Sequence, residues 1–186
     1  MKTKDFLVVA LAPMLVLLVP LVAMQFTKEV NWTISDFVLA WVLLAGATFA
    51  YKLLATRATG NIAYRAGAGL AVAAGFLLTW INAAVAIIGE HNPANALYLG
   101  VILVGMIGAG FARFQPRGMA RALFATAFAQ FLVPVIAVIV WPSDFGPGVA
   151  KVFMLNGFFV LMFAGSGLLF RHAARQPNGS SVATTA

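Results

Sequence analysis

The sequence predicts an all-α fold, a polytopic transmembrane bundle of six helices joined by short loops. Of the 186 residues, 62% are hydrophobic and only 9% are charged, and the mean hydropathy is +0.97. A soluble domain carries about 25% charged residues. Six apolar runs each approach the roughly 20 residues that a helix needs to cross a hydrocarbon core about 30 Å thick. Charged residues fall at or near the ends of these runs. We therefore expect the apolar runs themselves to be surrounded by lipid.

The six apolar runs divide almost the whole chain between them. We predict one transmembrane domain over residues 1–175 and a disordered polar tail over residues 176–186. The first run follows two lysines, as in a signal peptide. Its apolar stretch exceeds the roughly 7–15 residues of a signal sequence and no clear cleavage site follows, so we expect a retained anchor helix. The runs cover residues 6–26, 34–54, 65–89, 95–113, 119–141 and 150–170.

Polar and proline residues mark the ends of the predicted helices. Thr33 is a suitable cap for the second helix, with Asp36 in its first turn favoured by the helix dipole. Asn92 followed by Pro93 has the pattern of a cap and first residue, and predicts the start of the fourth helix. The segment 115–118, Gln-Pro-Arg-Gly, predicts a tight turn between the fourth and fifth helices.

The distribution of charge predicts the orientation of the bundle. With six spans both termini lie on one side, and that side carries ten of the twelve basic residues. The opposite side carries Lys28 and Lys151 together with four of the five acidic residues. Because short loops rich in lysine and arginine stay in the cytoplasm, we expect both termini to be cytoplasmic. The same interpretation explains the net charge of +7 without a nucleic-acid partner.

Several classes of chemistry find no support in the sequence. There is no cysteine, and no run carries an ionisable residue near its middle, where proton relays and ion-coupled transporters place theirs. The two histidines, His91 and His172, are predicted on opposite sides of the membrane and so do not form one haem or metal site. Phosphate-binding loops and nucleophile–base pairs are absent from the sequence as well. We therefore expect no enzymatic activity, cofactor or metal.

Polar residues gather around the turn between the third and fourth runs. At 1.5 Å per residue, Asn82 and Asn156 lie at similar depths, about 10 and 9 Å below the outer ends of their helices. Gln130 and Thr126 lie at membrane depth in the fifth run. We predict a polar cluster in the outer half of the bundle, which is either a ligand site or a structural clasp. Its members are Asn82, Glu90, Asn92, Asn95, Tyr98 and Asn156.

Small residues recur at helical spacing in the third and fourth runs. In lipid, helix backbones approach closely only over such small faces. They predict either internal helix packing or contact with a partner helix, including a second copy of the chain. The residues concerned are Gly67, Ala71, Gly75, Gly105 and Ala109.

Two segments resemble a family of small uncharacterised bacterial inner-membrane proteins. The segments are WINAAVAIIGEHNPANALY, which contains the NPAN turn, and ARFQPRGMARALFATAFAQ. The resemblance covers roughly residues 32 to 139. It implies a location in the bacterial inner membrane and brings no activity with it, because the family has no established function.

Three functional hypotheses follow from the sequence. The first is a non-enzymatic accessory, assembly or helix-packing component of a membrane complex, in contact with lipid and with other subunits or itself. The second is a small-molecule or lipid transporter with an outward-facing polar pocket. The third is a membrane-bound enzyme that uses Glu90 and His91.

Overall fold

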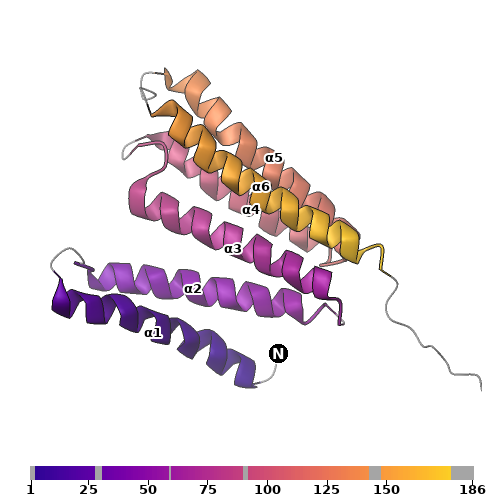
Figure 1. Cartoon of the computed structure of the whole chain (residues 1–186), viewed down its shortest axis with the longest axis horizontal. Helices are drawn as coiled ribbons and strands as arrows, with labels where there is room; N and C mark the ends of the chain where they lie inside the picture. The colour runs from indigo at the N-terminus through magenta and orange to yellow at the C-terminus, as the bar shows by residue number, and fades with distance from the viewer. Residues whose placement is uncertain (1–2, 28–30, 59, 90–91, 143–147, 177–186) are drawn as a thin grey trace, which may run out of the picture. The chain divides into compact units, whose positions relative to one another are not determined.

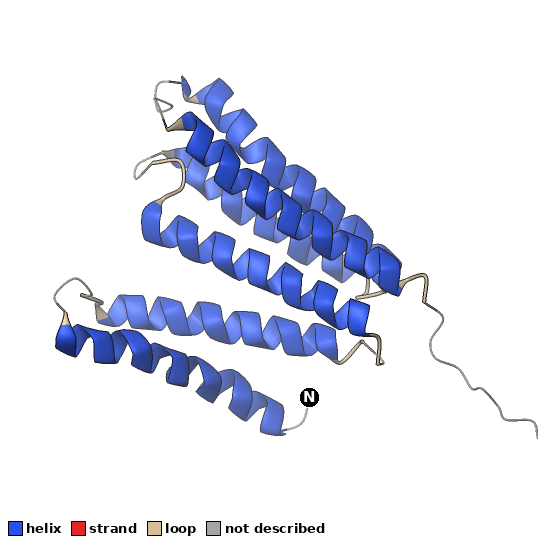
Figure 2. Ribbon diagram, viewed as in Figure 1, coloured by secondary structure: helices blue, strands red, loops and turns tan. Residues whose placement is uncertain are grey.

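The computed structural model describes residues 3–27, 31–58, 60–89, 92–142 and 148–176. These residues form helices and connecting turns, with no strand among them (Figure 2). Six segments are long and apolar enough to cross a membrane. The predicted fold class is confirmed, and the protein is a multi-pass integral membrane protein. In chain order (Figure 1) the elements are α1 (Thr3–Phe26), α2 (Ile34–Ala55), α3 (Ile62–Val85), the 3₁₀ helix η1 (Pro93–Ala96), α4 (Leu97–Phe111), α5 (Pro116–Val140) and α6 (Val149–Ala173).

The main difference from the predicted boundaries lies at the turn between α3 and α4. We expected the third helix to continue to residue 89, but it ends at Val85 because Ala86 has a left-handed backbone with φ of 45°. Asn92 is a cap as predicted, but it caps η1 and α4 begins only at Leu97. The turn is therefore longer than expected, and it has room for hydrogen bonds of its own.

Residues 1–53 form the first of two compact units, which contains α1 and most of α2. Thr33 caps α2 as predicted: its Oγ1 accepts from the Asp36 N–H at 3.4 Å, and its own N–H donates to Asp36 Oδ2 at 2.7 Å. Trp41 Nε1 donates to the Ala10 carbonyl at 3.2 Å and so joins the two helices. Among the described residues of this unit, the buried side chains are those of Pro13, Ala40 and Ala45.

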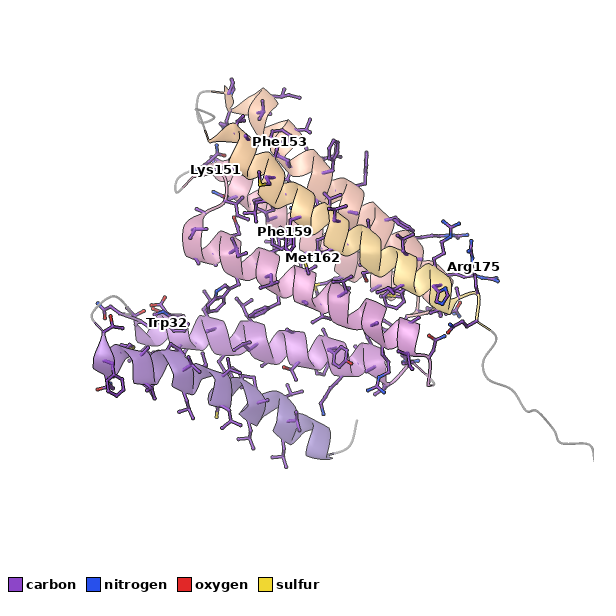
Figure 3. The ribbon with its side chains drawn as sticks, viewed as in Figure 1. Trp32, Lys151, Phe153, Phe159, Met162 and Arg175 are labelled. Atoms are coloured by element: carbon purple, nitrogen blue, oxygen red, sulfur yellow. The ribbon has the colours of Figure 1, made fainter. Side chains whose placement is uncertain are left out.

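Residues 54–186 form the second unit, in which α3 to α6 pack around a common core. Helix α6 lies between α3 and α5, and α4 packs mainly against α5 (Figure 1). Large side chains fill the core, among them Tyr64, whose ring meets that of Phe170 edge-on at 4.8 Å. Phe159 on α6 is fully buried (Figure 3). The prediction of one domain over residues 1–175 stays a prediction.

Small residues allow the close approaches within the second unit. A Cβ atom added at Gly67 of α3 would lie 3.1 Å from the Phe170 ring, and the Gly67 carbonyl accepts from Ser166 Oγ at 2.7 Å. A Cβ atom at Gly105 of α4 would lie 3.2 Å from Thr126 Oγ1 of α5. Gly75 has looser surroundings, with Ile102 Cδ1 at 3.5 Å. Glycines at helical spacing therefore line the seams α3–α6 and α4–α5.

A still closer approach between α4 and α5 involves a glycine outside the predicted set. A Cβ atom added at Gly108 would lie only 2.8 Å from Ala122 Cβ and 3.3 Å from its Cα. The residues Ala71 and Ala109, which we predicted at helix interfaces, are both partly buried. The spacing of small residues alone did not distinguish this close contact from its neighbours, because several registers of the same helix carry glycine or alanine.

Candidate functional site

The turn between α3 and α4 is held together by three asparagines, which we call the turn cluster: Asn82, Asn92 and Asn95. Asn92 Oδ1 accepts from the Ala94 N–H at 2.7 Å and caps η1. Asn95 Oδ1 accepts from the Ile88 N–H at 3.0 Å, and its Nδ2 donates to the Gly89 carbonyl at 2.7 Å. Asn82 Nδ2 in α3 donates to the Asn95 carbonyl at 3.2 Å. These amides replace the helical hydrogen bonds that the turn lacks.

A second polar group lies in the core, between α4, α5 and α6. We call it the polar triad, and it consists of Tyr98, Gln130 and Asn156. Gln130 Nε2 donates to Asn156 Oδ1 at 2.8 Å, and Asn156 Nδ2 donates to the Tyr98 hydroxyl oxygen at 3.0 Å. The same Nδ2 also donates to the Val152 carbonyl at 2.8 Å. All three side chains are at most 2% exposed, so each of these bonds is shielded from water.

The predicted cluster is therefore divided into two hydrogen-bonded groups. Asn82, Asn92 and Asn95 belong to the turn, while Tyr98 and Asn156 belong to the triad. The described hydrogen bonds of Asn82 and Asn156 share no partner. The chain links the two groups at Asn95 and Tyr98, which are separated by about one helical turn. Glu90 was also predicted here, and it lies outside the described residues, as does His91.

Gln130 is the member of the triad that the predicted cluster did not include. Counted along a straight helix, it lies about 15 Å from the end of α5, deeper than Asn156 at about 10 Å from the start of α6. Depth counted this way assumes that helices are parallel and begin at the same level. One signal in the sequence could have included Gln130: both Gln130 and Asn156 are amides at membrane depth. An unpaired polar group there costs several kcal/mol, so each amide needs a hydrogen-bond partner.

Two buried acceptors in these groups have no hydrogen-bond donor from the protein. They are Asn82 Oδ1 in the turn cluster and Gln130 Oε1 in the triad. A buried carbonyl oxygen without a partner costs about 1–3 kcal/mol. Each therefore offers a place for a donor hydrogen from a bound molecule or a water. Amide groups of this kind bind neutral polar molecules, and they lack the basicity needed for proton transfer.

Metal-ligating side chains do not gather in the described part of the chain. No group of three or more histidine, cysteine, aspartate or glutamate residues lies together there. His172 lies exposed at the end of α6, where its Nε2 is 3.0 Å from Gln176 Nε2. The arrangement of the described polar residues is thus suited to holding helices and turns together or to accepting hydrogen bonds from a neutral ligand.

Comparison with protein-family models, with curated proteins and with solved structures finds no match to this chain.

Proposed function

We propose that this protein is a non-enzymatic accessory or assembly component of a bacterial inner-membrane complex. The observation that carries the proposal is that the amide side chains at membrane depth form hydrogen bonds with other groups of the protein. The Asn156 side chain forms hydrogen bonds with Gln130, Tyr98 and the Val152 carbonyl, and thereby connects α6 to α5 and α4. A transport site must release and rebind its substrate, whereas these bonds hold three helices in one arrangement.

We place the proposed contact with another membrane protein in the first unit, because α1 has the smallest buried share of the six spans. Only 6% of the α1 span is buried, and α1 presents large apolar side chains such as Leu15 and Val19, which are 67% and 70% exposed. Two helices with small buried residues do not form a core of their own. In lipid, association of such helices depends on close packing and hydrogen bonds with neighbouring helices. We place the proposed partner contact on α1.

Purification from the native membrane tests this proposal. The tagged full-length protein, extracted in mild detergent, is expected to carry a second protein at a fixed ratio in native mass spectrometry. A photoreactive amino acid at Leu15 should cross-link to that protein. The matched control is Leu161 on α6, which is apolar and 73% exposed but belongs to the second unit, and which should give no such cross-link.

A transporter for a neutral small molecule or lipid is the second candidate. The unpartnered oxygens of Asn82 and Gln130 favour it, because a ligand hydrogen could fill either one. In that case the purified protein would be free of other proteins and would carry a small molecule at a fixed ratio. Loss of that molecule in Gln130→Leu, with the folded protein retained, would replace the first proposal by the second.

The cytoplasmic location of both termini is also part of the proposal, and the absence of cysteine makes it easy to test. Gly148 and Arg175 are exposed near the two ends of α6 and make suitable positions for single cysteines. In intact cells, an impermeant thiol reagent should modify Gly148→Cys and spare Arg175→Cys, because the arginine-rich end stays inside. The reverse pattern would invert the proposed orientation.

A further inference from the structure

A cavity of about 380 Å³ opens at the end of the second unit where α3 and α5 begin and α6 ends. Two hydrogen bonds fix its walls. The Tyr64 hydroxyl donates to the Phe114 carbonyl at 2.7 Å, and Asn61 Nδ2 donates to the Ala173 carbonyl at 3.3 Å. Ligand-binding pockets have volumes of about 300–1,000 Å³, so the cavity is large enough for a small molecule or a lipid headgroup. Its polar lining consists of Arg57, Asn61, Tyr64, Gln115, Arg117 and Gln176.

The charged side chains that line this cavity are all positive. Arg57 and Arg117 line it, and the described residues of the second unit include no aspartate or glutamate. The guanidinium carbon of Arg57 lies 5.8 Å from the centre of the Phe114 ring, so an aromatic face supports this side chain beside the cavity. Further arginines cluster near the same end of the unit, as Arg175 shows at the end of α6 (Figure 3). An anion entering here would meet no carboxylate from the described residues of the second unit.

Helix α5 adds a second source of positive potential. Its N-terminus lies in the wall of the cavity, because Gln115 and Pro116 both line it. Gln115 occupies the cap position without a side-chain hydrogen bond to the helix, in contrast to Asn61, which caps α3 by accepting from the Tyr64 N–H at 3.0 Å. The free N–H groups and the dipole at the start of a helix favour a bound anion.

We propose that this cavity binds a phosphate group, supplied by an anionic phospholipid headgroup or by a soluble phosphate. The guanidinium fork of arginine matches phosphate oxygens in geometry and charge. Basic pockets between transmembrane helices, at the membrane surface, are known places for such headgroups. Asn61, Gln115 and Gln176 supply amide groups for the remaining polar atoms of the ligand.

Lipid titration of the purified full-length protein tests the site. In neutral detergent, phosphatidylglycerol is expected to bind more tightly than phosphatidylcholine by native mass spectrometry, and to raise the melting temperature. The double variant R57Q/R117Q should bind phosphatidylglycerol roughly 30-fold more weakly, since each arginine that reaches the phosphate from the cavity wall contributes about a fivefold gain. The control R65Q/R171Q removes two exposed arginines that do not line the cavity, and should keep the wild-type affinity.

A third variant keeps the proposal testable if the double variant fails to fold. In Gln115→Glu the added carboxylate stabilises the start of α5 but repels a phosphate. We expect an unliganded melting temperature at or above that of the wild type, with the response to phosphatidylglycerol lost. If inorganic phosphate alone gives the same stabilisation and displaces the lipid, the source is soluble, and if it does neither, the source is lipid. Equal binding of the two lipids, or an undiminished response in Gln115→Glu, would overturn the proposal.

Discussion

Replacing Asn156 by leucine is expected to lower the free energy of unfolding by about 2–4 kcal/mol. The change leaves the Gln130 amide N–H without its acceptor and the Tyr98 hydroxyl oxygen without its donor, in a site where all three side chains are buried. Bulk water does not reach these groups at membrane depth, so the solvent does not restore the lost hydrogen bonds. Unfolding of the purified protein in mixed micelles, followed by helical circular dichroism, measures the loss.

A double-mutant cycle shows whether the triad acts as one unit. Once Asn156 is leucine, the change Gln130→Leu removes an already orphaned amide, so the double variant should be more stable than the sum of the single effects by about 1–2 kcal/mol. The pair Asn82→Leu and Asn156→Leu is the control, and its effects should add within about 0.5 kcal/mol because the two residues share no described partner. Additive effects of Asn156→Leu and Gln130→Leu would contradict the interpretation of the polar triad as a structural clasp.

Replacing Gly108 by alanine is expected to destabilise the protein by about 1–3 kcal/mol through overpacking. The new methyl group would lie 2.8 Å from Ala122 Cβ, and the next atom is the Ala122 Cα of the α5 backbone at 3.3 Å. A flexible side chain could move aside, but here two helix backbones must separate. The melting temperature in detergent should fall, and the seam between α4 and α5 should become accessible to hydrogen exchange.

Gly110 in the same helix is the matched control. A Cβ atom added there meets nothing within 4 Å, and the residue is exposed. Gly110→Ala should be neutral or stabilise the helix by up to about 1 kcal/mol, because glycine is the poorer helix former. Opposite signs at two glycines in the same helix would separate packing from helix propensity. Equal effects at the two positions would show that the α4–α5 contact is looser than described.

Much of the fold could be predicted because the bilayer imposes strong constraints on sequence. A span must be long and apolar, and it must satisfy its backbone hydrogen bonds internally, so six apolar runs predict six helices. Local chemistry also placed caps at Thr33 and Asn92. The end of α3 was not predicted, because the left-handed residue is Ala86, and alanine gives no local signal for that conformation.

The amides were visible in the sequence, but their pairing was not. Asn82 and Asn156 were expected in one cluster on the basis of depth. In the structure, Asn156 is hydrogen-bonded to Gln130 and Tyr98, whereas Asn82 is hydrogen-bonded to the backbone of the turn. Which amides meet depends on how α4, α5 and α6 are rotated and offset, and a count of 1.5 Å per residue contains neither quantity.

The sequence by itself determined that this chain resides in lipid, how many helices it has and where its charges fall, because these follow from composition and position along the chain. Only the tertiary structure decided that Gly108 meets Ala122, that the triad closes across three helices, and that Arg57 and Arg117 line one cavity. In the sequence, the positive-inside rule alone was sufficient to explain where these arginines lie. Their second role emerges only when helices distant in sequence bring them to the same wall, since a cavity is a property of packing.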